Sequence, residues 1–326
     1  MFFFDSSSGT FFRRFAATPP HGGGIIIEDF RLDNPHDLVE SNEWTLDKFL
    51  EMVQSVQADL DGVQGISRED CYGLVDLGAE MSLLYGANVS LVDDDYALNI
   101  GTDRVFDLIT KIRGVLDDKQ HVFNMEDITT GADVGGNPWA YTRSYFAQGH
   151  SLFITGTPEL TSEFRDMETG YGVVPLPKYD ANQKDYTSRI DSCSGAFLLP
   201  NFEKRIDGVS SSYRRTGMIL EYLAYKSSED DPDSVKNAYY ETTIKSQRQT
   251  IEKNKEMLDI VKGSGLYEWA DVYWVGGSPE KGEDTISGVL SAMSASGRGL
   301  MSTYKRSAAR LQKAIDDIYA SIEALD

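Results

Sequence analysis

The residues with the clearest chemical potential follow a short apolar strand. Leu152, Phe153 and Ile154 predict a strand that is apolar on both faces, as expected inside a sheet covered by helices. The sequence Thr157-Pro158-Glu159 comes next and offers an N-cap, a proline at the first helical position and an acidic residue in the first turn. Ligands of open α/β sheets usually bind at the carboxyl ends of the strands. The loop that carries Glu159 is therefore a place where a ligand would usually bind.

Carboxylates at such a position could also catalyse hydrolysis. A glycosidase requires two carboxyl groups held about 5–10 Å apart, and the sequence allows Glu159 to pair with Asp191 or Asp271. The chain contains no nucleophile elbow, phosphate-binding glycine loop or metal motif that would support another type of catalysis. A carbohydrate-active, glycosidase-like enzyme is thus one of the alternatives.

The segment Asp59–Asp70 resembles a calcium-binding loop, in which oxygen ligands occupy the first, third, fifth and twelfth positions and glycine the sixth. Aspartate stands at the first, third and twelfth positions, the third being Asp61. However, Val63 and Gln64 take the fifth and sixth positions, so one ligand and the turn glycine are replaced. We therefore predict a turn that binds no metal, and no cofactor is expected elsewhere.

The composition excludes several classes of protein. A chain of 326 residues with 40% hydrophobic and 25% charged residues is long enough for two lobes or one large domain. The formal net charge of −21 argues against nucleic acid, which requires clustered lysine and arginine. The two cysteines, Cys71 and Cys193, and the four scattered histidines lack the spacing of a zinc site. Two unpaired thiols are the simpler interpretation, with one long-range disulfide as the alternative.

Residues 1–24 lack the pattern of a domain core. Two phenylalanine clusters are separated by serine and glycine, and Pro19–Gly24 forms a flexible break. The apolar blocks are short, Asp5 interrupts them and no lipid-accepting cysteine follows, so no export signal is recognised. We expect an irregular or disordered start. No apolar run in the chain reaches the about 20 residues that a membrane-spanning helix needs.

Helical periodicity and short apolar runs alternate from residue 25 onward. Thr45 is predicted to cap a one-sided helix. Tyr141 and Tyr145 share one helix face, whereas Trp139 lies at the preceding turn and off that face, which favours a ligand contact. Further elements are expected as strands at 71–75, 172–175 and 194–200, and as helices at 105–112, 218–223, 235–244, 251–261 and 301–322, the last docked on its own lobe.

The order of these pieces resembles the extracellular solute-binding proteins of bacterial ABC sugar importers, the maltose-binding-protein-like family 1. The similarity covers roughly residues 25–326 and is carried by the following segments: Asn34–Val39 with Trp44-Thr45, the Asp59–Asp70 loop before Tyr72-Gly73, Phe146–Gly149 with Leu152-Phe153, Gly172–Asp180 with Gln183 and Tyr186, and Glu252–Ile260.

The resemblance implies an α/β fold of the periplasmic-binding-protein-like type II, N-terminally truncated, because most of the first lobe of the family does not precede residue 25. By this analogy, residues 25–193 and 264–326 form the second, C-terminal lobe. Residues 194–263 are a helical return that belongs to the first lobe, and its apolar face would be exposed.

The same resemblance implies a function without catalysis. The chain would be a monomeric receptor that binds a monosaccharide or oligosaccharide and delivers it to the membrane permease of an ABC importer. Its expected location is extracellular, at the cell surface or periplasmic, as in this family of often lipid-anchored proteins. The ligand-binding residues that we expect are Tyr85, Trp139, Glu159, Tyr186 and Trp274. Besides the glycosidase, the remaining alternative is a truncated fragment that binds no ligand.

Overall fold

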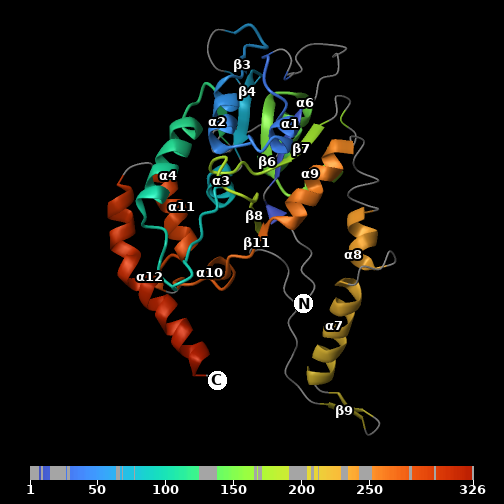
Figure 1. Cartoon of the computed structure of the whole chain (residues 1–326), viewed down its shortest axis with the longest axis vertical. Coiled ribbons are helices and arrows are strands. Elements are labelled where there is room, and N and C mark those ends of the chain that lie inside the picture. The colour runs from blue at the N-terminus through green and yellow to red at the C-terminus, as the bar shows by residue number, and fades with distance from the viewer. Residues whose placement is uncertain are drawn as a thin grey trace.

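A mixed β-sheet with helices on both faces forms the centre of the molecule (Figure 1). The computed structural model describes residues 7–8, 10–14, 27, 30–63, 67, 69–76, 78–124, 138–164, 167, 171–190, 204–206, 209–211, 213–228, 234–241, 252–278, 281–296 and 299–324.

Buried parallel strands make up the middle of this sheet. Strand β4 (Cys71–Asp76) pairs in parallel with β5 (Val122–Asn124) and with β6 (Ser151–Gly156), and β3 (Gln57–Ala58) adds an antiparallel neighbour to β4. All residues of β4 and β7 (Tyr171–Pro175) are buried, which is typical of strands covered on both faces. The three strands expected from apolar runs in this part of the chain are confirmed.

The start of the chain contributes a strand to the same sheet. Strand β2 (Thr10–Arg14) lies between β6 and β7 and is antiparallel to both, so that Phe12 stands opposite Ile154 and Val173. The short β1 (Ser7–Ser8) pairs elsewhere. The expectation of an irregular start is therefore wrong for these two segments. A run of five residues has no measurable period, and its conformation depends on partners more than 140 positions away.

Alternating side chains of the strands create two hydrophobic cores. Leu74 and Phe153 belong to the larger core, and Val75 and Ile154 to the smaller one on the opposite face. The larger core is completed by α1 (Pro35–Glu40), α2 (Leu46–Gln54), α3 (Ala79–Gly86), α4 (Asp103–Leu116), α11 (Ile286–Ser296) and α12 (Leu300–Glu323). The smaller core is completed by α6 (Pro138–Gln148) and by the segment around the 3₁₀ helix η2 (Pro158–Ser162).

Local signals at helix ends are confirmed. The Thr45 hydroxyl accepts a hydrogen bond from Lys48 N at 3.4 Å and so caps α2, as expected. The indole of Trp44 donates to Pro175 O at 2.8 Å, which fixes the start of α2 to the end of β7. The C-terminal helix α12 docks through Leu311 and Ile315, both fully buried, as predicted.

Helix α9 (Glu252–Gly263) packs on β7, and the assignment of residues 194–263 to a first lobe stays a prediction. The buried Asn254 side chain accepts from Val173 N and donates to Tyr171 O, both at 2.9 Å. Nε2 of His36 lies 3.0 Å from Val173 O. These side chains satisfy the outer edge of β7 in place of a further strand. The apolar residues Met257, Leu258 and Val261 of α9 are buried together with Asn254.

A second, three-stranded sheet gathers distant parts of the chain. Strand β8 (Ser188–Ile190) pairs antiparallel with β1 and parallel with β11 (Gly265–Leu266). In Figure 1, β8 and β11 lie below the main sheet, and the described part of residues 204–241 lies beyond them. That part comprises β9 (Lys204–Ile206), β10 (Val209–Ser211), α7 (Tyr213–Ser228) and α8 (Val235–Asn237). The strand expected at 194–200 lies outside the described residues.

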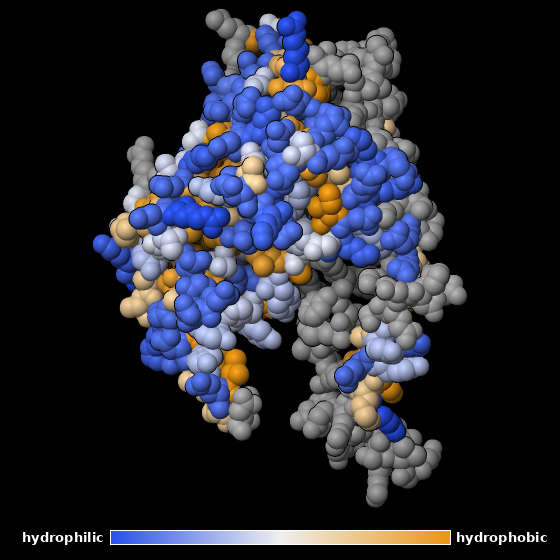
Figure 2. All heavy atoms as spheres, viewed as in Figure 1, coloured by the Kyte–Doolittle hydropathy of each residue, from blue (hydrophilic) through white to orange (hydrophobic). Residues whose placement is uncertain are grey.

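Helix α7 presents apolar side chains to solvent, as predicted for the helical return. Met218, Ile219, Tyr222 and Leu223 are between 47% and 60% exposed. Figure 1 shows the helix standing apart from the main sheet, and Figure 2 shows hydrophobic residues on its surface. None of the described helices combines the length and the apolarity needed to cross a membrane.

Candidate ligand-binding site

A pocket of about 610 Å³ opens where α3 and α11 begin and where the chain turns after α10 (Trp269–Val272). Helix α3 starts three residues after β4, so the pocket lies next to the carboxyl end of a central parallel strand, the usual position of ligands in such sheets. Its lining consists of Met81, Asp271, Trp274, Gly277, Gly282, Glu283, Asp284, Thr285, Ser287, Gly288 and Ser291.

Trp274 is the prominent aromatic residue of the pocket. Its side chain is 60% exposed, and its backbone has a φ of 53°, in the left-handed region that a tryptophan rarely adopts. Such strain costs about 1–3 kcal/mol and persists only where the surroundings impose it. Here the buried Val275 imposes it, because Val275 N donates to Ala270 O and Val275 O accepts from Ile286 N. The turn therefore holds the indole at the pocket.

Close backbone packing brings the opposite wall near Trp274. A side chain on Gly277 would meet Thr285 Cγ2 at 2.7 Å and Trp274 O at 3.2 Å, so this position requires glycine. The Thr285 hydroxyl accepts from Gly288 N at 2.9 Å and lies 3.0 Å from Ser287 Oγ. The first turn of α11 thus places hydroxyl groups and a helix N-terminus beside the indole.

Acidic residues complete the lining. Asp271 is buried to 6% exposure, Glu283 is half-buried and Asp284 is exposed. Behind them, the buried Glu268 accepts from Leu91 N at 2.9 Å and ties α10 to the loop after α3. Burial raises the pKa of Glu268, although hydrogen bonds from backbone N–H groups oppose this shift. Carboxylates, hydroxyls and an indole together can bind the hydroxyl groups and the C–H faces of a polyol.

An arginine from the C-terminal helix fixes two parts of the lining. Arg310 donates from Nη1 to Gly276 O and from Nη2 to Asp284 O, the latter at 2.8 Å. Because both acceptors are backbone carbonyls, the guanidinium holds the turn after α10 and the start of α11 at a fixed separation. The geometry of the pocket therefore depends on α12.

Of the five residues expected at a ligand site, one lines this pocket, and the ligand-contact assignments of the others stay predictions. Trp274 lines the pocket. Tyr85 is buried in α3, with its carbonyl accepting from the Thr187 hydroxyl at 2.6 Å. Tyr186 packs against the larger core, with Lys178 Nζ 5.0 Å from its ring centre, and burial raises its pKa. Neither tyrosine lines the pocket.

The other two expected residues come from the elements that flank β6 in the sequence. Trp139 is 47% exposed near the start of α6 and is not part of the pocket lining. Glu159 follows β6 within η2, a 3₁₀ helix instead of a regular helix, and its side chain lies outside the described residues, as does Asp191. Both ligand-contact assignments stay predictions. The sequence analysis did not single out Glu283, Thr285 and Ser287. The available signal was the glycine pair Gly276-Gly277, which follows a segment rich in tyrosine and tryptophan.

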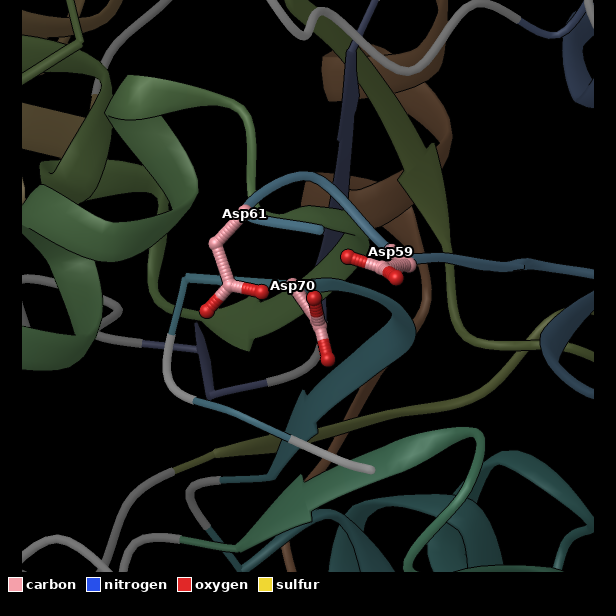
Figure 3. Close-up of side chains that lie close together, drawn as sticks. All are labelled: Asp59, Asp61 and Asp70. Atoms are coloured by element: carbon pink, nitrogen blue, oxygen red, sulfur yellow. The ribbon is translucent and has the colours of Figure 1, made fainter. Parts of the chain in front are cut away.

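The carboxylates of the Asp59–Asp70 loop do converge. Figure 3 shows Asp59, Asp61 and Asp70 together, and one oxygen from each lies within 4.8 Å of the others. Asp70 is buried and accepts from Leu60 N at 3.2 Å and Ser67 N at 2.8 Å, while Asp61 accepts from the Ser67 hydroxyl at 2.7 Å. The hydroxyl of Ser67 is the main cause that lowers the pKa of Asp61. The loop is thus organised by its own hydrogen bonds. That it binds no metal stays a prediction.

Comparison with known proteins identifies the fold. No protein-family model matches the chain, and no curated protein matches it in sequence. UgpB from Mycobacterium tuberculosis, solved with glycerophosphocholine, superimposes with a TM-score of 0.50 and 15% identity over 95% of this chain and 69% of that one.

A solute-binding protein of an ABC transporter from Thermotoga lettingae TMO, solved with α-D-tagatose, gives a TM-score of 0.50 and 15% identity over 95% of this chain and 71% of that one. The mixed sheet with helices on both faces is therefore common to all three chains, and this one spans about 70% of the length of the other two. The chain has the α/β fold of the periplasmic binding proteins that serve as solute-binding proteins of ABC transporters.

Proposed function

We propose that this chain binds a sugar or a related polyol in the pocket around Trp274 and passes it to an ABC importer. The observation that carries the proposal is the exposed indole, held in a strained conformation against a wall of hydroxyls and carboxylates. Sugars offer C–H faces that stack on an aromatic ring and hydroxyl groups that both donate and accept hydrogen bonds. The lining provides partners for each of these groups.

Delivery requires that the ligand be enclosed and later released. The sheet β1–β8–β11 supports a hinge at the base of the main body, because three distant segments of the chain meet there in short strands. Short terminal segments of this kind absorb the backbone changes of domain closure. The permease partner, the extracellular or periplasmic location and the lack of catalysis are parts of this proposal. They are supported by the fold and by the resemblance in motif order.

Thermal-shift measurements with a panel of monosaccharides and oligosaccharides test the proposal. We expect at least one sugar to raise the melting temperature of the chain without being consumed. Trp274→Ala should weaken its binding about tenfold, since an aromatic contact contributes about 0.5–1.5 kcal/mol beyond its buried area. Tyr225→Ala is the control, because Tyr225 is 61% exposed on α7 and does not line the pocket.

Two results would contradict the proposal. The absence of any shift across the panel would leave the pocket without a sugar ligand. Release of a phenol from aryl glycosides, abolished in Asp271→Asn, would instead identify a glycosidase, the alternative considered for this residue.

A further inference from the structure

The charge of the pocket around Trp274 is strongly one-sided. Asp271, Glu283 and Asp284 are three of its eleven lining residues, and none of those residues is lysine, arginine or histidine. A neutral ligand does not require this bias, because uncharged hydroxyls and amides supply hydrogen bonds at a smaller desolvation cost. The lining therefore carries information about the charge of the ligand.

Within the part of the chain that the structure describes, the positive groups near the pocket only partly offset the negative charge of its lining. The guanidinium of Arg310 donates to the carbonyls of Gly276 and Asp284, so its donors are directed at backbone oxygens. Lys281 is exposed on the hairpin next to the pocket and does not line it. The N-terminus of α11 contributes about half a positive charge, and Thr285 already caps one of its N–H groups. Among the described residues, the lining carries the carboxylates of Glu283 and Asp284 and no cationic side chain.

The indole of Trp274 fits a cation as well. Tryptophan is the side chain whose ring face attracts an ammonium group most strongly, and the attraction increases where the group is partly desolvated. Trp274 is exposed, and the half-buried Glu283 lines the same pocket. An ammonium group can therefore contact a ring face and a carboxylate at the same time, while the hydroxyls of Thr285 and Ser287 bind the rest of the ligand.

We propose that the ligand is a polyol with a protonated amine, such as an amino sugar, and that this pocket discriminates against acidic sugars. The inference rests on the proposed function, since it specifies the ligand class of the same site. The net charge of −21 adds to the effect by raising the local concentration of cations around the whole molecule.

Isothermal titration calorimetry with matched sugars tests the inference. The probes are glucosamine, glucose and glucuronate, and the corresponding three sugars of the galactose series. We expect the amine to bind about tenfold more tightly than the neutral sugar of its series, and the acid to bind more weakly than both. Added salt should weaken only the binding of the amine, because salt screens charge–charge attraction.

Two variants show whether the affinity for the amine depends on the charge of the pocket. Glu283→Gln should reduce the affinity for the amine more than that for the neutral sugar, so that the ratio of the two affinities falls. Asp94→Asn removes the same charge from an exposed loop outside the pocket and should change neither affinity. If a neutral or acidic sugar binds as tightly as the amine, the inference is overturned while the proposed function stands. If no member of either series binds, both are overturned.

Discussion

At the scale of single residues, buried polar side chains do most to define the architecture around the pocket. Asn254 replaces a strand along the edge of β7, and Glu268 joins α10 to the loop that follows α3. Each satisfies backbone groups that would otherwise be buried without partners, at a cost of about 1–3 kcal/mol per group. Because these contacts connect residues far apart in the sequence, no local sequence pattern predicts them.

The buried Glu268 makes stability depend on pH. Its pKa in the folded state is raised above the ordinary value of 4.5 by burial. Between these two values the folded state binds more protons than the unfolded state, so the contribution of Glu268 to the free energy of unfolding rises as the pH falls. In Glu268→Gln this contribution is lost. We expect the free energy of unfolding of the wild type to increase relative to that of the variant as the pH is lowered.

Urea denaturation at a series of pH values from neutral toward 4.5 measures this shift. Glu221→Gln, at an exposed position on α7, serves as the control and should give a difference independent of pH. A difference for Glu268→Gln that also stays constant across the series would rule out a raised pKa.

At the scale of elements, β2 is the strand on which the sheet depends most. It fills the gap between β6 and β7 and pairs with both along its length. Without it, two buried strands would each lose a hydrogen-bonded neighbour, and backbone groups would be left without partners. Helices α2 and α9 then pack on a sheet whose continuity comes from the start of the chain.

A proline in β2 should therefore be strongly destabilising. Phe12→Pro removes a backbone N–H from the middle of a strand with neighbours on both sides and should cost about 3 kcal/mol or more. Phe12→Val keeps the N–H and the preference for a strand and should cost much less. Circular dichroism and urea denaturation compare the two. Equal stability of the two variants would show that β2 does not pair within the sheet.

The elements also show what the sequence could predict. Strands β4, β6 and β7 and helices α2 and α4 have apolar patterns that are readable within about ten residues, and the structure confirms them. Strand β2 and the placement of α9 depend on distant partners, so local patterns could not reveal them. In the pocket, Trp274 was expected as a ligand contact from the family resemblance. Glu283 and Thr285 were missed because their role depends on how α10, α11 and α12 are brought together.

At the scale of the whole molecule, the distribution of apolar surface is uneven. The main body buries its hydrophobic residues in two cores, whereas α7 exposes an apolar face built around Met218 and Tyr222. These two residues are four positions apart and share one side of the helix. Exposed contiguous patches of this kind promote association between molecules.

We expect the face of α7 to govern the solubility of the chain. The double variant Met218→Glu and Tyr222→Glu should bind less of the dye 8-anilinonaphthalene-1-sulfonate and should self-associate less in sedimentation velocity experiments. Ile322→Glu is a suitable control, because Ile322 is 57% exposed on α12 and outside this face. If the control reduces dye binding and association as much as the double variant, the apolar face of α7 is not their cause.

The strained turn at Trp274 also has an optical consequence. The fully buried Trp44 should emit at short wavelength, whereas Trp274, 60% exposed, should emit at long wavelength and be accessible to quenchers. Because Asp271, Glu283 and Asp284 surround it, a caesium cation should quench its emission more effectively than iodide does. In a variant that lacks the exposed Trp139, the turn that presents the indole to a ligand thus provides an intrinsic fluorophore that reports the electrostatic potential at the pocket.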